Sequence, residues 1–269
     1  MKPTKLKFTS WSPSRLFDYD QCPLYARLKH LDKLCPKCFK GKVRGGFDKP
    51  EICDTCGHVK QVPAPLARGS EIGLNLERYV NNEEGRLHEE IRHPGIIALA
   101  RELRREHGKG RVKTELPIIC DDQWAPLQGK FPEGAWLRTK LDVFRNVTAK
   151  VARVIDWKTG GIDRDTGAVK DDKDKYEDQL SVYSVVTLCA FPTVEYVESA
   201  LAFVDAGPRY NPIVEMKKCH LDRKDLEKAK KKWEARTKPM LKDTTFAPRA
   251  NERCKWCEFR KGKGGPCRF

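Results

Sequence analysis

Long apolar runs are absent from this sequence. Nowhere do about 18 uncharged apolar residues follow one another, and a membrane-spanning helix needs a run of about that length. The first residues, MKPTKLKFTSW, are basic, but no apolar stretch follows them as it would in a secretory signal. We therefore expect a soluble protein of the cytoplasm that has no membrane partner.

Large apolar residues are also scarce in residues 35–60, CPKCFKGKVRGGFDKPEICDTCGHVK. Such a segment cannot fold around a core of its own. It contains two Cys-x2-Cys pairs, and 14 residues separate Cys38 from Cys53. This spacing is typical of a four-thiolate zinc ribbon, in which tetrahedral Zn²⁺ supplies the folding free energy. The predicted zinc ligands are Cys35, Cys38, Cys53 and Cys56.

Acidic residues are fewer than basic residues. The chain of 269 residues has 53 Lys and Arg against 38 Asp and Glu, a formal net charge of +15, and we expect this excess to be spread along the whole chain. Many lysines only keep helix surfaces soluble, as in residues 224–236, but the total favours a polyanionic partner. The ribbon segment carries a small basic module that could bind DNA or a partner protein, formed by Lys37, Lys40, Lys42 and Arg44.

Eleven cysteines are unusual for a protein without a secretory signal. Seven of them lie in or beside Cys-x2-Cys pairs, so metal ligation in a reducing compartment is a better interpretation than disulfides. In the tail, Cys254, Cys257 and Cys267 form a group that lacks a fourth ligand. Of the other four cysteines, Cys120, Cys189 and Cys219 stand in apolar or strand-like settings, and we expect these three to be buried structural thiols.

The hydrophobic periodicity predicts an α/β core with a partly antiparallel sheet. Ser12 as N-cap and Pro13 at the first helical position predict a helix that runs to about Cys22 and resumes after Pro23. Helical spacing follows, then strand patterns, then helices and strands in alternation. The expected helices are 69–82, 94–107, 176–190 and a basic helix from about 222, and the expected strands are 112–120, 135–144, 151–158, 194–206 and 212–221.

Two of these strands bring acids together. If their turn is centred near Ala149, Asp142 and Asp156 lie opposite each other with Cβ atoms about 5 Å apart. Lys158 then shares the face of Asp156. Carboxylates this close repel each other unless a divalent cation lies between them, and such a cation beside a lysine suits phosphodiester hydrolysis. The alternative is a cross-strand surface pair, since Asp-x-Lys alone often occurs by chance.

Seven short segments of the sequence resemble motifs of the PD-(D/E)xK nuclease superfamily, and within it of the RecB-like, AddB-like branch that includes phage-encoded exonucleases. They follow the family's order over nearly the whole chain: SPSRLFDYDQCP, RGSEIGLNLERYV, VKTELPI, WLRTKLDVF, VIDWKTG, QLSVY and the cysteine tail. The resemblance implies a restriction-endonuclease-like mixed sheet flanked by helices, with the four-cysteine zinc ribbon inserted. The expected parts are an N-terminal helical part of the nuclease domain (1–34), the ribbon (35–62), the nuclease core (63–245) and a cysteine cluster that closes on Cys22 (246–269).

The resemblance also implies roles for single residues. Asp142 corresponds to the family's first metal-binding acid, Asp156 to the second and Lys158 to the catalytic lysine, with Mg²⁺ or Mn²⁺ as the ion. Gln179 and Tyr183 match the family's Gln-x3-Tyr signature beside the active site and DNA. Without the resemblance, they would be a surface pair one helical turn apart.

One position departs from the family. Its helix usually reads Gly-x3-His, with the histidine as an additional metal ligand, whereas here Gly69 is followed four residues later by Gly73. Glu77, one turn further on, is a candidate replacement, and Glu115 in an earlier strand is another acid near the metal. The alternatives are a site of two acids and waters, or a protein that has lost activity.

The resemblance also implies a fourth ligand for the three cysteines of the C-terminal tail. In relatives, one early and three late cysteines hold a 4Fe–4S cluster that joins the ends of the domain. The resemblance implies the same structural cluster on Cys22, Cys254, Cys257 and Cys267. Nine residues separate the last two, which is longer than usual, and four thiolates could equally take a second Zn²⁺.

The resulting hypothesis is a metal-dependent DNA exonuclease of phage DNA recombination, repair or replication, in the cytoplasm of a bacterial host. A helicase or an annealing protein is a candidate partner, and the oligomeric state stays open. The same catalytic residues would serve a structure-specific endonuclease. The alternative outside the enzymes is a protein with the nuclease fold that binds DNA but has no catalytic activity.

Overall fold

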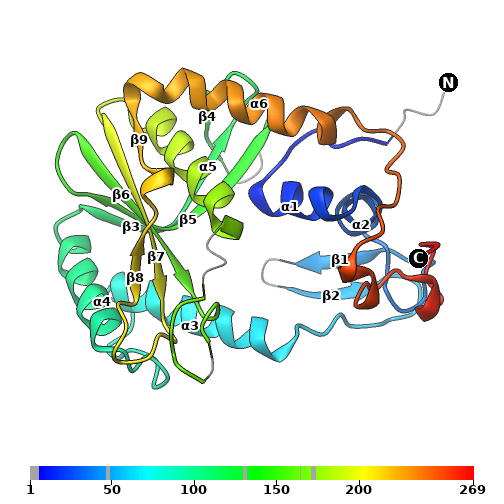
Figure 1. The fold of residues 1–269 in the computed structure, drawn as a ribbon, viewed down its shortest axis with the longest axis horizontal. Helices are drawn as coiled ribbons and strands as arrows, with labels where there is room; N and C mark the ends of the chain where they lie inside the picture. The colour runs from blue at the N-terminus through cyan, green and yellow to red at the C-terminus, as the bar shows by residue number, and fades with distance from the viewer. Residues whose placement is uncertain (1–5, 47–48, 130–131, 164, 171–173) are drawn as a thin grey trace. The chain divides into compact units, whose positions relative to one another are not determined.

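The structure is a computed structural model, and it describes residues 6–46, 49–129, 132–163, 165–170 and 174–269. The chain divides into two compact units (Figure 1). The larger unit, Pro63–Trp233, is called the core unit below. The smaller unit combines Met1–Val62 with Glu234–Phe269 and is called the terminal unit.

A seven-stranded mixed sheet forms the centre of the core unit. The strand order is β4-β3-β5-β6-β7-β8, and β9 pairs with β7. β6 and β7 run parallel, and the other described pairings of this sheet are antiparallel. The strands are β3 Val112–Cys120, β4 Pro126–Leu127, β5 Leu137–Asn146, β6 Val151–Lys158, β7 Tyr196–Phe203, β8 Ile213–Glu215 and β9 Leu221–Asp222.

Helices cover both faces of this sheet. On one face, Ile72 of α3 (Ala64–Val80) and Ile96 of α4 (Pro94–His107) share an apolar cluster with Val143 of β5. The next residue of β5, Phe144, points to the other face, where its ring stacks on that of Phe191, just after α5 (Asp174–Ala190), with 4.3 Å between centroids. The expected mixed α/β fold is confirmed. The helices are α3 Ala64–Val80, α4 Pro94–His107, α5 Asp174–Ala190 and α6 Leu226–Lys242. The boundary between the two units falls inside α6, after Trp233.

Several elements differ from their expected bounds by a few residues, and the differences in three of them have a local cause. α3 begins at Ala64 rather than Gly69, because Pro65 in its first turn lacks an N–H that would be unpaired there in any case. The strand expected at 212–221 is interrupted after β8 by a 3-10 turn, η2 Lys217–Cys219. A second 3-10 turn, η3 Arg223–Asp225, delays the start of α6.

The terminal unit is built from both ends of the chain. Ser12 caps its first helix by accepting a hydrogen bond from the N–H of Arg15, as predicted. Phe8 and Phe246 meet edge to face with 5.9 Å between ring centroids, so residues from both ends share one core. The elements of this unit, besides the end of α6, are α1 Pro13–Gln21, α2 Pro23–Ala26, the π-helical turn η1 Arg27–Leu31, β1 Val43–Gly46, β2 Lys49–Cys53, and the 3-10 turns η4 Glu252–Lys255 and η5 Lys261–Lys263.

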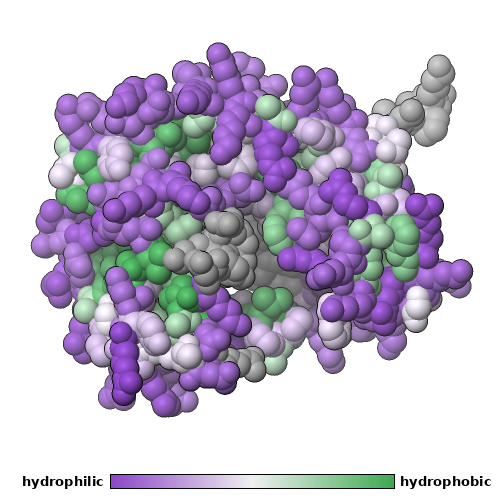
Figure 2. All heavy atoms as spheres, viewed as in Figure 1, coloured by the Kyte–Doolittle hydropathy of each residue, from purple (hydrophilic) through white to green (hydrophobic). Residues whose placement is uncertain are grey.

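The surface seen in Figure 2 is mostly hydrophilic, with small apolar areas between polar side chains. None of the helices in the described part of the chain is both long and apolar enough to cross a membrane.

Candidate active site and metal centres

The strand register aligns three acids across the sheet of the core unit. Val143 pairs with Ile155 in the β5–β6 hairpin, so Asp142 and Asp156 are the next pair along it. In the β3–β5 ladder, Thr114 pairs with Val143 and Leu116 with Leu141, so Glu115, whose backbone is left-handed (φ 47°), falls at the position beside Asp142. Residues that oppose each other in an antiparallel pair share one face of the sheet. The three acids therefore form a row across β3, β5 and β6, on the face that α5 covers.

The electrostatics of this row favour a cation. Burial, together with the nearby charge of Asp156, raises the pKa of Asp142 to about 7. Asp156 is only 1% exposed, and its burial raises its pKa against the opposing charge of Lys158. Burial also raises the pKa of Glu77, and Glu115 contributes to the same shift. The site thus combines buried and half-buried oxygen ligands of the kind that Mg²⁺ and Mn²⁺ prefer, with carboxylates that repel each other without such an ion.

Gln179 of α5 joins the lysine and an acid of this site. The Nζ of Lys158 forms an ion pair with Oδ2 of Asp156 and donates a hydrogen bond to Oε1 of Gln179 at 3.2 Å. The Nε2 of Gln179 donates to Oδ1 of Asp156 at 2.9 Å and to the hydroxyl of Tyr183 at 2.7 Å. In the β5–β6 hairpin, Oδ2 of Asp142 accepts a hydrogen bond of 2.9 Å from the backbone N–H of Trp157, the residue after Asp156. The structure therefore brings all five expected catalytic residues together.

Two further residues of the site were missed from the sequence. Lys140 forms an ion pair with Glu115, and the Nζ of Lys158 lies 4.6 Å from the ring centroid of Tyr176. Period-2 alternation could have indicated Lys140, two residues before Asp142 in β5. The spacing of three residues between Tyr176 and the glutamine of α5 could have indicated the aromatic ring.

The two glycines of α3 have different surroundings. A Cβ at Gly69 would lie 2.7 Å from Oγ1 of Thr159, the residue that follows Lys158, so this glycine permits the helix to approach the end of β6. A Cβ at Gly73 would meet nothing within 4 Å. The position at which the family usually carries histidine therefore faces open space. Glu77 lies one turn further along α3, where burial and then the charge of Glu115 raise its pKa.

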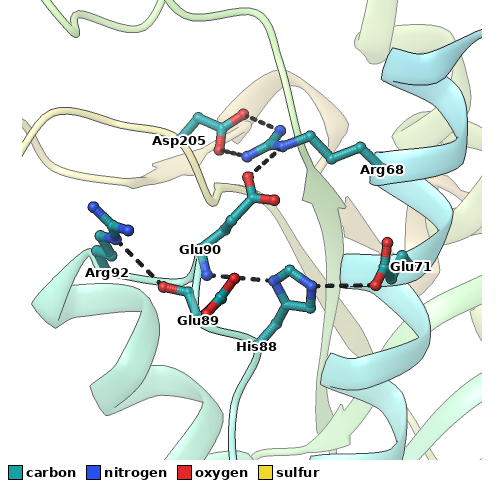
Figure 3. Close-up of polar contacts among 7 residues, drawn as sticks. All are labelled: Arg68, Glu71, His88, Glu89, Glu90, Arg92 and Asp205. Atoms are coloured by element: carbon teal, nitrogen blue, oxygen red, sulfur yellow. Dashed lines mark hydrogen bonds and ion pairs between the residues drawn. The ribbon is translucent and has the colours of Figure 1, made fainter.

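Arg68 holds the helix at this close approach (Figure 3). Its two terminal nitrogens donate to both carboxylate oxygens of Asp205 at 2.9 and 2.7 Å, and its Nε donates to Glu90 at 2.6 Å. Nearby, Nε2 of His88 lies 3.4 Å from a carboxylate oxygen of Glu71 on the same helix. Because Arg68 directly precedes the close glycine, these contacts fix the start of α3 against the loops that follow β7 and precede α4.

In the terminal unit, the four ribbon cysteines cluster as a zinc ribbon requires. The Sγ atoms of Cys35 and Cys56 are 3.8 Å apart, and those of Cys38 and Cys53 are 3.7 Å apart. Sulfurs bound at about 2.3 Å to one tetrahedral Zn²⁺ would be about 3.8 Å apart. Hydrogen bonds from backbone N–H groups, led by that of Gly41, lower the pKa of Cys38 to about 6, which favours the thiolate that a metal needs.

The tail cysteines also converge, but more loosely. The pKa of Cys257 is raised by burial and, to a smaller extent, by the charges of Cys267, Cys22 and Cys254. The side-chain amide of Asn251 donates a hydrogen bond of 2.8 Å to the backbone oxygen of Gln21, the residue before Cys22. This bond connects the C-terminal tail to α1. Of the residues that the structure describes, only the ribbon cysteines form a group of three or more metal-ligating side chains with all ligand atoms within 4.8 Å. Of the remaining thiols, Cys120 and Cys219 are buried and Cys189 is half-buried.

Comparison with known proteins identifies the family. One solved structure, titled "Crystal structure of SSO0001", is similar at 16% identity and a TM-score of 0.41, over 96% of this chain and 86% of that chain. No curated protein matches the sequence. The PD-(D/E)XK nuclease superfamily matches residues 54–261, which include the acid row, Lys158 and α5. The chain therefore belongs to the PD-(D/E)XK nuclease superfamily.

Proposed function

We propose that the chain is a Mg²⁺- or Mn²⁺-dependent DNA exonuclease of the RecB-like, AddB-like branch, of the phage-encoded type that serves DNA recombination, repair or replication. Its superfamily is one of metal-dependent nucleases. The observation that supports the proposal best is the contact of Gln179 with both Lys158 and the buried Asp156. An ordinary surface pair of Asp and Lys would be exposed to solvent and would have no third residue to orient it.

Each residue of the site has a role in this proposal. Asp142 and Asp156 hold the cation, and Glu115 and Glu77 extend the set of oxygen ligands. When bound, the cation supplies Lewis-acid activation of water and neutralises charge on the phosphate. The ammonium of Lys158 orients the nucleophile and stabilises the negative charge that develops in the transition state. Gln179 and Tyr183 keep the lysine in place.

The terminal unit would carry two structural metal centres. The ribbon cysteines suit Zn²⁺, and the spacing of their sulfurs supports that choice. The resemblance implies a 4Fe–4S cluster on Cys22, Cys254, Cys257 and Cys267, and the charges of the other three cysteines act on Cys257 in the structure. A second Zn²⁺ is the alternative. The four parts expected from the sequence, 1–34, 35–62, 63–245 and 246–269, remain the proposed division of the chain.

The test is cleavage of matched linear and closed-circular DNA, each single- and double-stranded, with Mg²⁺ or Mn²⁺. We expect degradation of the linear substrates only. Lys158→Ala should lower the rate by about 100-fold or more and leave DNA affinity within about twofold, since one of many phosphate contacts contributes little. Lys150→Ala is the matched control, because Lys150 lies exposed at the turn of the same hairpin and pairs with Glu195.

Two outcomes would replace the proposal. Cutting of circular DNA would indicate a structure-specific endonuclease that uses the same residues. Tight DNA binding without cutting in either metal would indicate an inactive binding protein, the alternative that the open space beside Gly73 supports. A Lys158→Ala variant that cuts as fast as the parent would show that the active site lies elsewhere.

A further inference from the structure

The positive charge of the chain is concentrated in the terminal unit. This unit holds 23 of the 53 Lys and Arg and 10 of the 38 Asp and Glu, a net charge of 23 − 10 = +13, whereas the core unit has 30 − 28 = +2. The expectation that the excess is spread along the whole chain is therefore wrong. Both ends of the sequence carry it, and folding gathers them into one unit.

Residues 249–268, called the C-terminal segment below, hold seven Lys and Arg but only two acids, Glu252 and Glu258. In the core unit, Arg153 forms ion pairs with Glu198 and Glu215, and many other cations are paired in the same way. In the C-terminal segment, by contrast, no described Lys or Arg forms an ion pair with a carboxylate; the nearest such pair along the chain is that of Arg236 with Asp20. The cations concerned are Arg249, Arg253, Lys255, Arg260, Lys261, Lys263 and Arg268.

Exposed aromatic rings lie among these cations. Trp256 is 76% exposed, the highest value among the exposed large apolar residues described. Phe17 of α1 is 39% exposed, and the guanidinium carbon of Arg253 lies 4.8 Å from its ring centroid. Arg253 and Trp256 are three residues apart in and just after η4, and residues at this spacing in a 3-10 turn lie on the same side. The Nζ of Lys255 lies 5.8 Å from the indole ring.

A ligand for this surface needs a planar apolar face and negative charge at short intervals. Single-stranded nucleic acid has both, since each nucleotide offers an unpaired base that can stack on an aromatic ring and a phosphate that can contact Lys or Arg. The bases of a duplex are stacked on one another and leave mainly phosphates for such a surface. We propose that the terminal unit binds single-stranded DNA, with a nucleobase stacked on Trp256 and phosphates on Arg253 and Lys255.

The test measures binding by the full-length chain without Mg²⁺ or Mn²⁺, so that no DNA is cut and no chelator removes zinc. The probes are a fluorescent oligo(dT), an abasic strand of the same length and a blunt duplex. Trp256→Ala should weaken oligo(dT) binding about tenfold, whereas Trp256→Phe should retain most of it. Tyr210→Ala is the matched control, because this ring of the core unit is 40% exposed. Abasic and duplex binding should change by less than about twofold, because the phosphate contacts remain.

Unchanged oligo(dT) affinity in Trp256→Ala would overturn the proposal. An equal loss on the abasic strand would also overturn it, since stacking would then play no part. If the variant instead lost binding only to phosphatidylglycerol vesicles, the surface would be a lipid site. Thermal unfolding and metal content of each variant verify that the terminal unit is intact.

The proposal that the ligand of this surface is DNA rests on the proposed nuclease function. The experiments can nevertheless contradict either proposal without contradicting the other. A chain that cuts no DNA and still needs Trp256 for oligo(dT) binding would contradict the nuclease and support the stacking surface. A chain that cuts DNA and binds oligo(dT) equally well without Trp256 would do the reverse.

Discussion

Gln179 donates a hydrogen bond from its side-chain amide to the buried carboxylate of Asp156, with 2.9 Å between the heavy atoms. The carbonyl oxygen of the same amide accepts a hydrogen bond from Lys158. A primary amide can donate and accept at once, which neither a carboxylate nor an ammonium can do. Gln179 can therefore orient an acid and a lysine of opposite charge without adding a charge of its own.

Replacing this amide should affect the reaction more than the fold. We expect Gln179→Ala to lower the rate of DNA hydrolysis about 10- to 100-fold, because Lys158 and Asp156 lose their common orienting group. The free energy of unfolding should fall by about 1 kcal/mol. Gln179→Glu should be at least as slow, because it adds a negative charge beside Asp156 and removes the donor. Gln123→Ala, in an exposed turn, is the control, and a fully active Gln179→Ala would contradict the role.

The two glycines of α3 should respond oppositely to alanine. Gly69→Ala places a Cβ against Thr159 and should lower the free energy of unfolding by about 1–3 kcal/mol. Gly73→Ala meets open space and should raise it by about 0.5–1 kcal/mol, because alanine favours helix. Urea denaturation of both variants checks this. Equal effects would show that α3 does not approach β6 as closely as the structure has it.

The ribbon cysteines should hold one zinc ion per chain. Cys53→Ser should lower the zinc content by one equivalent and remove the hydrogen-exchange protection of β1 and β2, since this small hairpin has little apolar core without the metal. Cys189→Ser, in α5 and outside both cysteine clusters, should leave zinc unchanged. Elemental analysis of the purified variants decides between these outcomes. Full zinc content in Cys53→Ser would mean that the metal binds elsewhere.

Asp18 should make the stability of the terminal unit depend on pH. Burial opposes its charge, but hydrogen bonds from His30 and Lys29 lower its pKa below the ordinary value of 3.8. A carboxylate with a lowered folded-state pKa stabilises the fold above its unfolded pKa, and this contribution is lost as the pH falls through the folded pKa. Asp18→Asn should therefore be less stable by about 1 kcal/mol at pH 6, and the difference should shrink as the pH falls below the ordinary Asp pKa of 3.8. A difference that does not change with pH would contradict this.

The catalytic hairpin could be predicted because its geometry is local. In a hairpin, the position of the turn sets the register, and period-2 alternation sets the face. The prediction that Asp142 lies opposite Asp156 and that Lys158 shares its face follows from those two rules, and the described register, which ends at Val143 and Ile155, has the predicted offset. The relation between Gln179 and Tyr183 is local too, since a helix brings residues four apart onto one face.

The rest of the site depends on elements that are distant in sequence. Spacing alone does not tell which strand pairs with β5, so it could not set Glu115 beside Asp142 or join Lys140 to that glutamate. Nor could it show that Gly69 is needed for a close approach while Gly73 is not. These facts follow from the packing of α3 against β6.

The sequence by itself determined the periodic elements, the acidic hairpin with its lysine and the four-thiolate ribbon, because each depends on residues a few positions apart. Only the tertiary structure decided which residues surround them and where the charge gathers. Phe17 and Arg253 lie near opposite ends of the chain, and the guanidinium of Arg253 lies 4.8 Å from the Phe17 ring because the two ends fold into one unit. Long-range contacts of this kind depend on the packing of the whole unit, which no local pattern encodes.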